Sequence, residues 1–195
     1  VHFSDPTGDA IMFHGEGLRQ NDGTLSPGYS ETNNVIIKNS TIIRARRNGI
    51  SFLDGRDITI DNCIISDTGQ GEQAYDSAGN KIASSSGYDP RYGIDLEAIR
   101  TRAADGSLQR TALNEDISIK NSMFTGNEKG DIVVFTANDV IIENNNFDSA
   151  VRSFASDYII VRNNNFRSRE LYSNVAVSIQ SFVHFQNEED TQGKE

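Results

Sequence analysis

The chain has 195 residues, enough for one domain, and its formal net charge of −10 comes from 28 acidic and 18 basic residues. This charge argues against nucleic acid and against an anionic membrane surface as partners, because both are bound through basic side chains. No apolar run reaches the length of a membrane-spanning helix, so we expect no membrane insertion. The single cysteine, Cys63, allows no internal disulfide and is expected to be a small packing residue.

In chain order, one nine-residue pattern recurs five times. Each copy has apolar residues at its second and fourth positions, Asn at its sixth, and Ile or Phe at its ninth. The copies begin at residues 34, 57, 116, 139 and 158, so the steps between them are 23, 59, 23 and 19 residues. A period near 20 residues with alternating apolar positions predicts an all-β solenoid in which each copy is a strand of one turn.

A second short strand is expected in each turn. Ile50 and Ile132 each begin an apolar run 16 residues after the start of a copy, and the next copy begins seven residues later. Val151 also begins a short strand seven residues before the next copy, and by the same pattern of turns we expect further second strands at 94–97 and, in an earlier turn, at 10–13. The Asn at the sixth position should form a structural ladder at a bend, because Asn tolerates the left-handed backbone and its amide can bond the next turn. The ladder residues are Asn39, Asn62, Asn121, Asn144 and Asn163.

The predicted coil covers residues 1–187, and a polar tail covers 188–195. Three insertions interrupt it, at 14–33, 67–91 and 99–115. A Gly-Asn pair within 75–82 and an Asp-Gly pair within 102–108 predict hairpin turns inside the last two. Because loops that break a repeat commonly carry function, the strand at 94–97, which lies between two insertions, is the best candidate site.

Asp95 and Glu97 should point outward from this strand, while Ile94 and Leu96 point into the coil. Two carboxylates on one strand face lie with their Cα atoms about 6.5 to 7 Å apart, an arrangement that suits glycosidic bond cleavage. The alternative is that both are ordinary surface carboxylates on the outside of the coil. No cluster has the spacing of a metal site, and no phosphate-binding or dinucleotide motif occurs, so we expect neither a metal nor another cofactor.

The neighbouring turns predict the surroundings of this pair. Glu97 should be flanked by Leu53 and Phe135, with Phe13 and Phe154 further along the same outer column. We therefore expect Glu97, with apolar neighbours, to be the protonated acid. Asp95, expected between Ser51 and Val133, should be the ionised carboxylate.

Three further side chains lie near the candidate strand in the sequence. Tyr92 opens the strand and is expected to reach the site from its edge. Arg91 and Arg100 either bind an anionic group of the substrate or pair with the two carboxylates.

The repeat resembles that of right-handed parallel β-helix proteins, the pectate lyase-like superfold, over about residues 8–185. The segment Arg91-Tyr-Gly-Ile-Asp-Leu-Glu is similar to the Tyr-Gly-x-Asp-Pro-His stretch of alginate epimerases and lyases. Tyr92 and Asp95 match that stretch, while Leu96 and Glu97 stand at its Pro and His positions. With its long hairpin insertions, this form looks most like phage tailspike and neck appendage proteins. That resemblance implies a homotrimer of side-by-side coils that binds, and often cleaves, a host surface polymer.

Three functions follow as hypotheses. The first is a segment of a phage tail or neck appendage on the virion that binds a surface polysaccharide or teichoic-acid-like polymer. In its stronger form this hypothesis has the segment also degrade the polymer, with Asp95, Glu97 and Tyr92 in the site. The second is a secreted polysaccharide lyase or epimerase that works as a monomer. The third is a non-enzymatic spacer or adhesin whose loops make subunit contacts.

Overall fold

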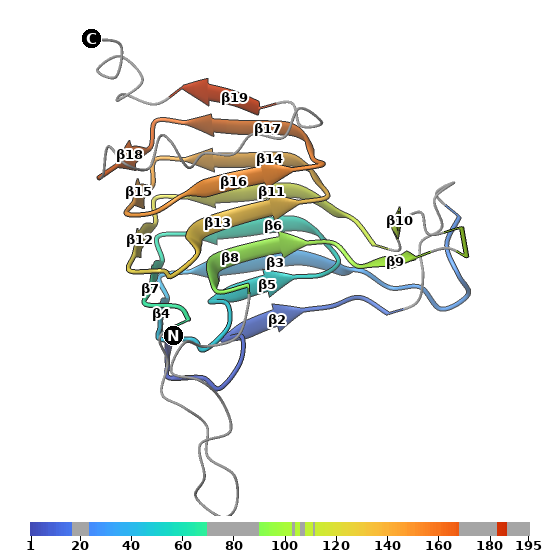
Figure 1. Ribbon diagram of the computed structural model, residues 1–195, viewed down its shortest axis with the longest axis horizontal. Coiled ribbons are helices and arrows are strands. Elements are labelled where there is room, and N and C mark those ends of the chain that lie inside the picture. Colours follow the sequence, from blue (N-terminus) through green and yellow to red (C-terminus); the bar gives the residue numbers. More distant parts are fainter. Residues whose placement is uncertain are drawn as a thin grey trace, which may run out of the picture.

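The computed structural model describes residues 1–16, 24–69, 90–102, 104–105, 108–110, 112–167 and 183–186. These residues form a coil of parallel strands in which each complete turn adds one strand to each of three sheets (Figure 1). Strands that lie one turn apart in the sequence are therefore hydrogen-bonded neighbours in space. Among the residues described, no helix is long and apolar enough to cross a bilayer.

The first sheet, called here the long-strand sheet, contains all five copies of the repeat. Val35, Ile58, Ile117, Val140 and Ile159 are paired from one strand to the next, so the copies align without a shift, as predicted. Its strands are, in spatial order, β3 (Thr32–Lys38), β6 (Gly55–Asp61), β11 (Asn114–Lys120), β14 (Ala137–Glu143), β17 (Asp157–Arg162) and β19 (Val183–Gln186).

The other two sheets complete each turn. The short-strand sheet contains β1 (His2–Ser4), β4 (Thr41–Ile43), β7 (Ile64–Ser66), β12 (Met123–Thr125), β15 (Asn146–Phe147) and β18 (Asn165–Phe166). The five-stranded sheet contains β2 (Ile11–Phe13), β5 (Ile50–Phe52), β8 (Tyr92–Glu97), β13 (Gly130–Phe135) and β16 (Val151–Phe154). A turn therefore has three strands where the sequence predicts two, because each nine-residue copy bends after its Asn and continues as a separate short strand.

The first strand of the five-stranded sheet differs from its predicted register by one residue. Ile11 pairs with Ile50 and Phe13 pairs with Phe52, whereas the spacing predicts that Phe13 lies beside Leu53 in the outer column. The Phe13 ring stacks on the Phe52 ring with centroids 4.5 Å apart, so this aromatic contact accounts for the shift. Phe13 consequently points into the coil and does not flank Glu97.

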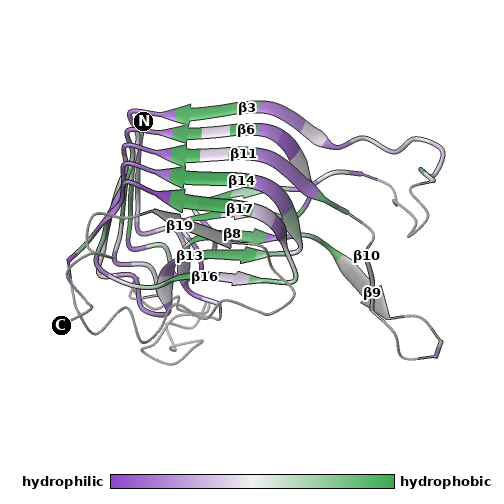
Figure 2. Cartoon of the chain, turned by 90° about the horizontal axis from the view of Figure 1, so that it is seen from above, coloured by the Kyte–Doolittle hydropathy of each residue, from purple (hydrophilic) through white to green (hydrophobic). Residues whose placement is uncertain are grey.

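One insertion forms a hairpin beside the coil. Strand β9 (Arg100–Arg102) pairs antiparallel with β10 (Leu108–Arg110), which confirms the hairpin predicted from the Asp-Gly pair. Figure 2, which looks down on the coil, shows β9 and β10 projecting away from the stacked sheets. The Gly-Asn turn predicted within 75–82 and the polar tail at 188–195 lie outside the described residues.

The coil is filled by apolar side chains from all three sheets. The second and fourth positions of the copies point inward and are buried, except for Val35, which is half-buried. The ninth positions of the last three copies form an aromatic stack, in which Phe147 lies between Phe124 and Phe166 with centroids 5.0 and 5.1 Å away. Burial of this continuous column stabilises strands that are each too short to form a core of their own.

The Asn at each bend has the predicted backbone but forms only part of the predicted ladder. All five sixth-position Asn residues have φ between 52° and 56°. Nδ2 of Asn62 donates to Oδ1 of Asn39 at 2.7 Å, whereas Nδ2 of Asn121 donates to Oδ1 of Asp61. A longer ladder is buried one position later, where the side chains of Ser122, Asn145 and Asn164 accept backbone N–H groups of the preceding turn. The seventh position points into the coil, where unpaired backbone groups cost most.

Candidate functional site

Strand β8 lies in the middle of the five-stranded sheet, between β5 and β13. Asp95 is paired with Ser51 on one side and with Val133 on the other, and Glu97 is paired with Phe135. Ile94 and Leu96 are fully buried inside the coil. The predicted alternation of β8 is therefore confirmed, and it places the two carboxylates on the outer face of the sheet.

A shallow pocket of about 220 Å³ lies on this outer face. It brings together the predicted residues Tyr92, Asp95, Glu97 and Phe135, which come from two adjacent strands. The Phe135 and Phe154 rings lie side by side at its edge with centroids 6.2 Å apart. Its lining is Pro90, Tyr92, Asp95, Glu97, Val133, Phe135 and Phe154. The pocket thus combines two carboxyl groups with an aromatic wall.

Asp95 is the most unusual group in the pocket because it is only 1% exposed. Its Oδ2 accepts a hydrogen bond from Nδ2 of Asn48 at 3.0 Å. Its Oδ1 is buried and accepts no hydrogen bond from any residue that the structure describes. Burial, and after it the negative charge of Glu97, raises the pKa of Asp95 from its ordinary value of 3.8 to about 7.

This result corrects the expected division of roles between the carboxyl groups. Asp95 was expected to stay ionised beside the Ser51 hydroxyl, yet Asp95 is the carboxyl group that burial favours in its protonated form. The Ser51 hydroxyl oxygen accepts a hydrogen bond from Nδ2 of Asn48 at 3.0 Å. The outward side of a β-helix strand is not necessarily exposed, and the sequence alone did not reveal that Asp95 is covered.

Tyr92 is buried at the edge of the pocket and is held at both ends. Its backbone N–H donates to Oδ1 of Asn48 at 2.8 Å. Its hydroxyl oxygen accepts a hydrogen bond from Nη1 of Arg152 at 2.9 Å, and the Arg152 guanidinium carbon lies 5.8 Å from the ring centroid. Tyr92 therefore forms a fixed wall of the pocket.

Two of the predicted binding residues, Arg91 and Leu53, are absent from the described lining of the pocket, and the position of a third, Arg100, stays a prediction. Arg91 forms an ion pair with Glu128 at the bend before β8. Leu53 follows β5, where its backbone bonds Phe13 and Ile99, and its side chain is half-buried. The backbone of Arg100 belongs to β9, and its side chain lies outside the described residues.

The sequence-based prediction missed two residues near the pocket, Asn48 and Arg152, although the register of the repeat offered a signal for each. Asn48-Gly49-Ile50 occupies the same register as Tyr92-Gly93-Ile94 one turn later. A Cβ on Gly49 would lie 2.5 Å from the Gly93 carbonyl oxygen, so glycine permits the close approach of the two segments. Arg152 pairs with Val133 in the predicted strand at 151–154, and this register places it in the outer column of Asp95.

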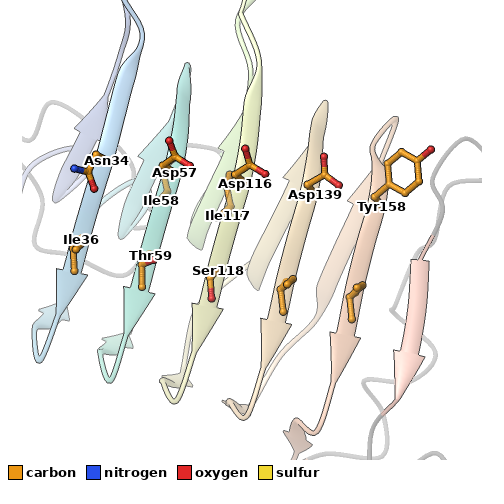
Figure 3. Close-up of a pocket in the computed structure, with 12 residues that line it drawn as sticks. Asn34, Ile36, Asp57, Ile58, Thr59, Asp116, Ile117, Ser118, Asp139 and Tyr158 are labelled. Atoms are coloured by element: carbon orange, nitrogen blue, oxygen red, sulfur yellow. The ribbon is translucent and has the colours of Figure 1, made fainter.

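A larger hollow of about 590 Å³ lies on the outer face of the long-strand sheet. Figure 3 shows a row of side chains across its strands, formed by Asn34, Asp57, Asp116, Asp139 and Tyr158. All five have a left-handed backbone, with φ between 52° and 57°. Asn and Asp are the residues that best tolerate this conformation, so the backbone accounts for the first four of them. The hollow contains no buried polar atom without a partner among its described lining, and we therefore take the Asp95 pocket as the candidate site.

Comparison with known proteins identifies the coil. Residues 20–102 match the family described as right handed beta helix region. The chain folds as a right-handed parallel β-helix. It is 29% identical over 151 residues to the "Uncharacterized protein YclG" of Bacillus subtilis (strain 168). The aligned region covers 77% of this chain and 22% of that protein. The chain thus spans about a fifth of the length of this curated relative.

A solved structure was also found to be similar. It is a tailspike protein, gp49 from Acinetobacter baumannii bacteriophage Fri1, described as a capsular polysaccharide depolymerase. The match has a TM-score of 0.43 and 15% sequence identity, and it covers 83% of this chain and 31% of that chain.

Proposed function

We propose that this β-helix segment binds a cell-surface polysaccharide or teichoic-acid-like polymer and hydrolyses a glycosidic bond of it at the Asp95 pocket. The Asp95 carboxyl group carries the proposal, since it is buried, has one oxygen without a described partner, and faces a pocket with a second carboxylate. Phe135 and Phe154 offer apolar surface for one face of a sugar ring.

In the proposed reaction Asp95 is the general acid. Its proton passes to the glycosidic oxygen as the bond from that oxygen to the anomeric carbon breaks. Glu97, which is more exposed at the mouth of the pocket, either deprotonates an attacking water or attacks the anomeric carbon itself. Water is the second substrate in both cases, and it ends as the new hydroxyl group of the released sugar.

The sequence resemblance to phage appendages favours a virion tail or neck as the setting, with the segment in a homotrimer. A secreted protein acting as a monomer is the alternative. Sedimentation velocity separates the two, because the appendage hypothesis requires a species of three chains, and a monomer at micromolar concentration contradicts it.

A polysaccharide lyase or epimerase is the second candidate. The observation that favours it is the match of Tyr92 and Asp95 to the epimerase and lyase stretch, together with the placement of Arg152 at the Tyr92 hydroxyl. A lyase produces an unsaturated uronic acid that absorbs in the ultraviolet, and an epimerase changes sugar stereochemistry without releasing reducing ends. Product analysis therefore distinguishes both from a hydrolase.

The test is a panel of capsular polysaccharides, cell-wall glycans and teichoic acids, assayed for binding and for release of reducing ends. We expect Asp95→Asn and Glu97→Gln to lower cleavage about 100-fold or more while binding remains, since general acid and base groups contribute about that factor. Asp116→Asn, an exposed carboxylate of the long-strand sheet, is the matched control and should keep full activity.

Two outcomes would contradict the proposal. If Asp95→Asn and Glu97→Gln leave both cleavage and binding unchanged, the assigned site is wrong. If the wild-type protein binds a polymer without cleaving any member of the panel, the segment is a spacer or adhesin.

A further inference from the structure

We propose that Asn48 is a positioning residue that selects Oδ1 as the Asp95 oxygen that carries the proton. This inference deepens the proposed function and rests on it, because it concerns the group assigned there as the acid. It follows from the hydrogen bonds around one buried amide.

The orientation of the Asn48 side chain is fixed by a group that can only donate. Asn48 is fully buried in the bend before β5. Its Oδ1 accepts the backbone N–H of Tyr92 at 2.8 Å, and a backbone N–H has no acceptor role. The Asn48 NH₂ group must therefore be at the other end of the amide. There it lies 3.0 Å from the Ser51 hydroxyl oxygen and 3.0 Å from Oδ2 of Asp95.

This orientation decides between the two oxygens of Asp95. Because Oδ2 accepts from an N–H donor, a proton on Oδ2 would make that oxygen a poorer acceptor and weaken the hydrogen bond. A proton on Oδ1 leaves the bond from Asn48 intact. Oδ1 is also the oxygen that no described residue engages, on a side chain that lines the pocket. The hydrogen bond from Asn48 to Oδ2 thus places the proton on Oδ1 of Asp95, from which it can be donated to a bound sugar.

Asn48 is itself held by the preceding turn of the coil. Its backbone N–H donates to Oδ1 of Asp9 at 2.9 Å, and its carbonyl oxygen accepts the N–H of Ala10 at 3.1 Å. Oδ2 of Asp9 in turn accepts a hydrogen bond from Arg47 at 2.6 Å. The amide consequently connects three successive turns, and a rotation that presented its oxygen to Asp95 would break the bond to Tyr92.

The charged groups that act on Asp95 come from several elements. Glu97 on β8 and Asp9 in the preceding turn favour the protonated form, whereas Arg47 and the Asn48 hydrogen bond favour the ionised form. Arg152 on β16 is a further cation in the same outer column, and it donates a hydrogen bond to the Tyr92 hydroxyl oxygen. Because the Asn48 bond favours ionisation, Asn48 must act by choosing the oxygen rather than by raising the pKa.

The test is a carbon-13 NMR titration of the Asp95 carboxyl group in the whole chain. In the wild-type protein we expect a midpoint near pH 7, and the side-chain NH₂ protons of Asn48 should shift with the same midpoint. This second reading requires no substitution, so it tests the contact even if a variant fails to fold. Asn48 protons that do not respond to the titration of Asp95 would overturn the inference.

Asn48→Asp and Ser51→Ala provide the matched variants. In Asn48→Asp one oxygen still accepts from Tyr92, and the other faces Oδ2 of Asp95, so the two carboxyls must share a proton. We expect the release of that proton to move up by about one pH unit or more, since two close carboxylates cannot readily both ionise. In Ser51→Ala, which keeps the Asn48 contact, the midpoint should stay within about 0.3 pH units.

The outcomes separate this inference from the function on which it rests. A wild-type midpoint in Asn48→Asp overturns the role of Asn48, whatever the cleavage assay gives. If the titration midpoint shifts as expected in Asn48→Asp but Asp95→Asn cleaves as well as the wild type, the proposed function is wrong. Asn48 would then still orient the proton of Asp95, but that proton would have no role in catalysis.

Discussion

Replacing Asp95 with Asn is predicted to make the protein more stable at alkaline pH while removing its proposed activity. Burial and the charge of Glu97 raise the pKa of Asp95 from 3.8 to about 7 in the folded protein. Below pH 3.8 the carboxyl is protonated in both the folded and the unfolded states. As the pH rises from about 4 to 7, the unfolded chain releases this proton and the folded protein keeps it, so stability is lost progressively.

The magnitude follows from the separation of the two pKa values. Each pH unit of separation corresponds to about 1.4 kcal/mol, so the full cost of Asp95 above pH 7 is about 4 kcal/mol. About 3 kcal/mol of this accumulates between pH 5 and pH 8. Asp95→Asn removes the ionisable group, so its stability relative to the wild type should rise by about 3 kcal/mol over that interval.

Urea denaturation of both proteins at pH 5 and pH 8 measures this difference. The pKa of Asp131 is also raised by burial, to about 6, but both proteins keep Asp131 and its contribution cancels in the comparison. Asp116→Asn is the control, and its stability relative to the wild type should change by less than about 0.5 kcal/mol. A stability difference between Asp95→Asn and the wild type that is the same at both pH values would show that the pKa of Asp95 is not raised in the folded protein.

Three further substitutions test the charge effect on Asp95 and the backbone and hydrogen bonds of the coil. Glu97→Gln should lower the NMR titration midpoint of Asp95, because the charge of Glu97 is the second cause of its raised pKa, and an unchanged midpoint would contradict this. Tyr158→Asn should raise the melting temperature, because a left-handed backbone costs an ordinary residue about 1 to 2 kcal/mol, whereas the control Asp139→Asn at the equivalent position should have little effect. A lower melting temperature for Tyr158→Asn would show instead that the Tyr158 side chain stabilises the coil. Asn145→Ala should lower the free energy of unfolding in urea by about 2 to 4 kcal/mol, because it removes the side-chain partner of the Ser122 N–H and of the Ile119 carbonyl oxygen. A loss below about 0.5 kcal/mol would count against a stabilising role for the buried ladder at the seventh position.

The fold was largely predictable from the sequence because the repeat determines it directly. The alternating apolar positions identified the strands, and the constant spacing gave the register of β5, β13 and β16. The register of β8 followed from the analogy of Ile94 and Leu96 with the apolar residues of those strands. The right-handed parallel β-helix suggested by the resemblance is confirmed. The register of β2 was wrong by one residue, because the stacking of Phe13 on Phe52 is a contact between side chains that spacing does not encode.

The position of the candidate pocket was predictable from the sequence, whereas the burial of its carboxyl groups was not. The interruption of the repeat located β8, and its register placed Asp95, Glu97 and Phe135 together. The protonation of Asp95 depends on how completely it is covered and on Asn48, which approaches it from the bend of the preceding turn. An alternating pattern identifies the outer face of a strand, but it contains no information about what lies over that face.

If Asp95 is the catalytic acid, as proposed, its titration must govern the pH dependence of glycan cleavage by the wild-type protein. We expect the rate to fall about tenfold for each pH unit above 7, because only the protonated carboxyl can donate to the glycosidic oxygen. A cleavage rate that stays constant or rises from pH 7 to pH 9 would contradict it.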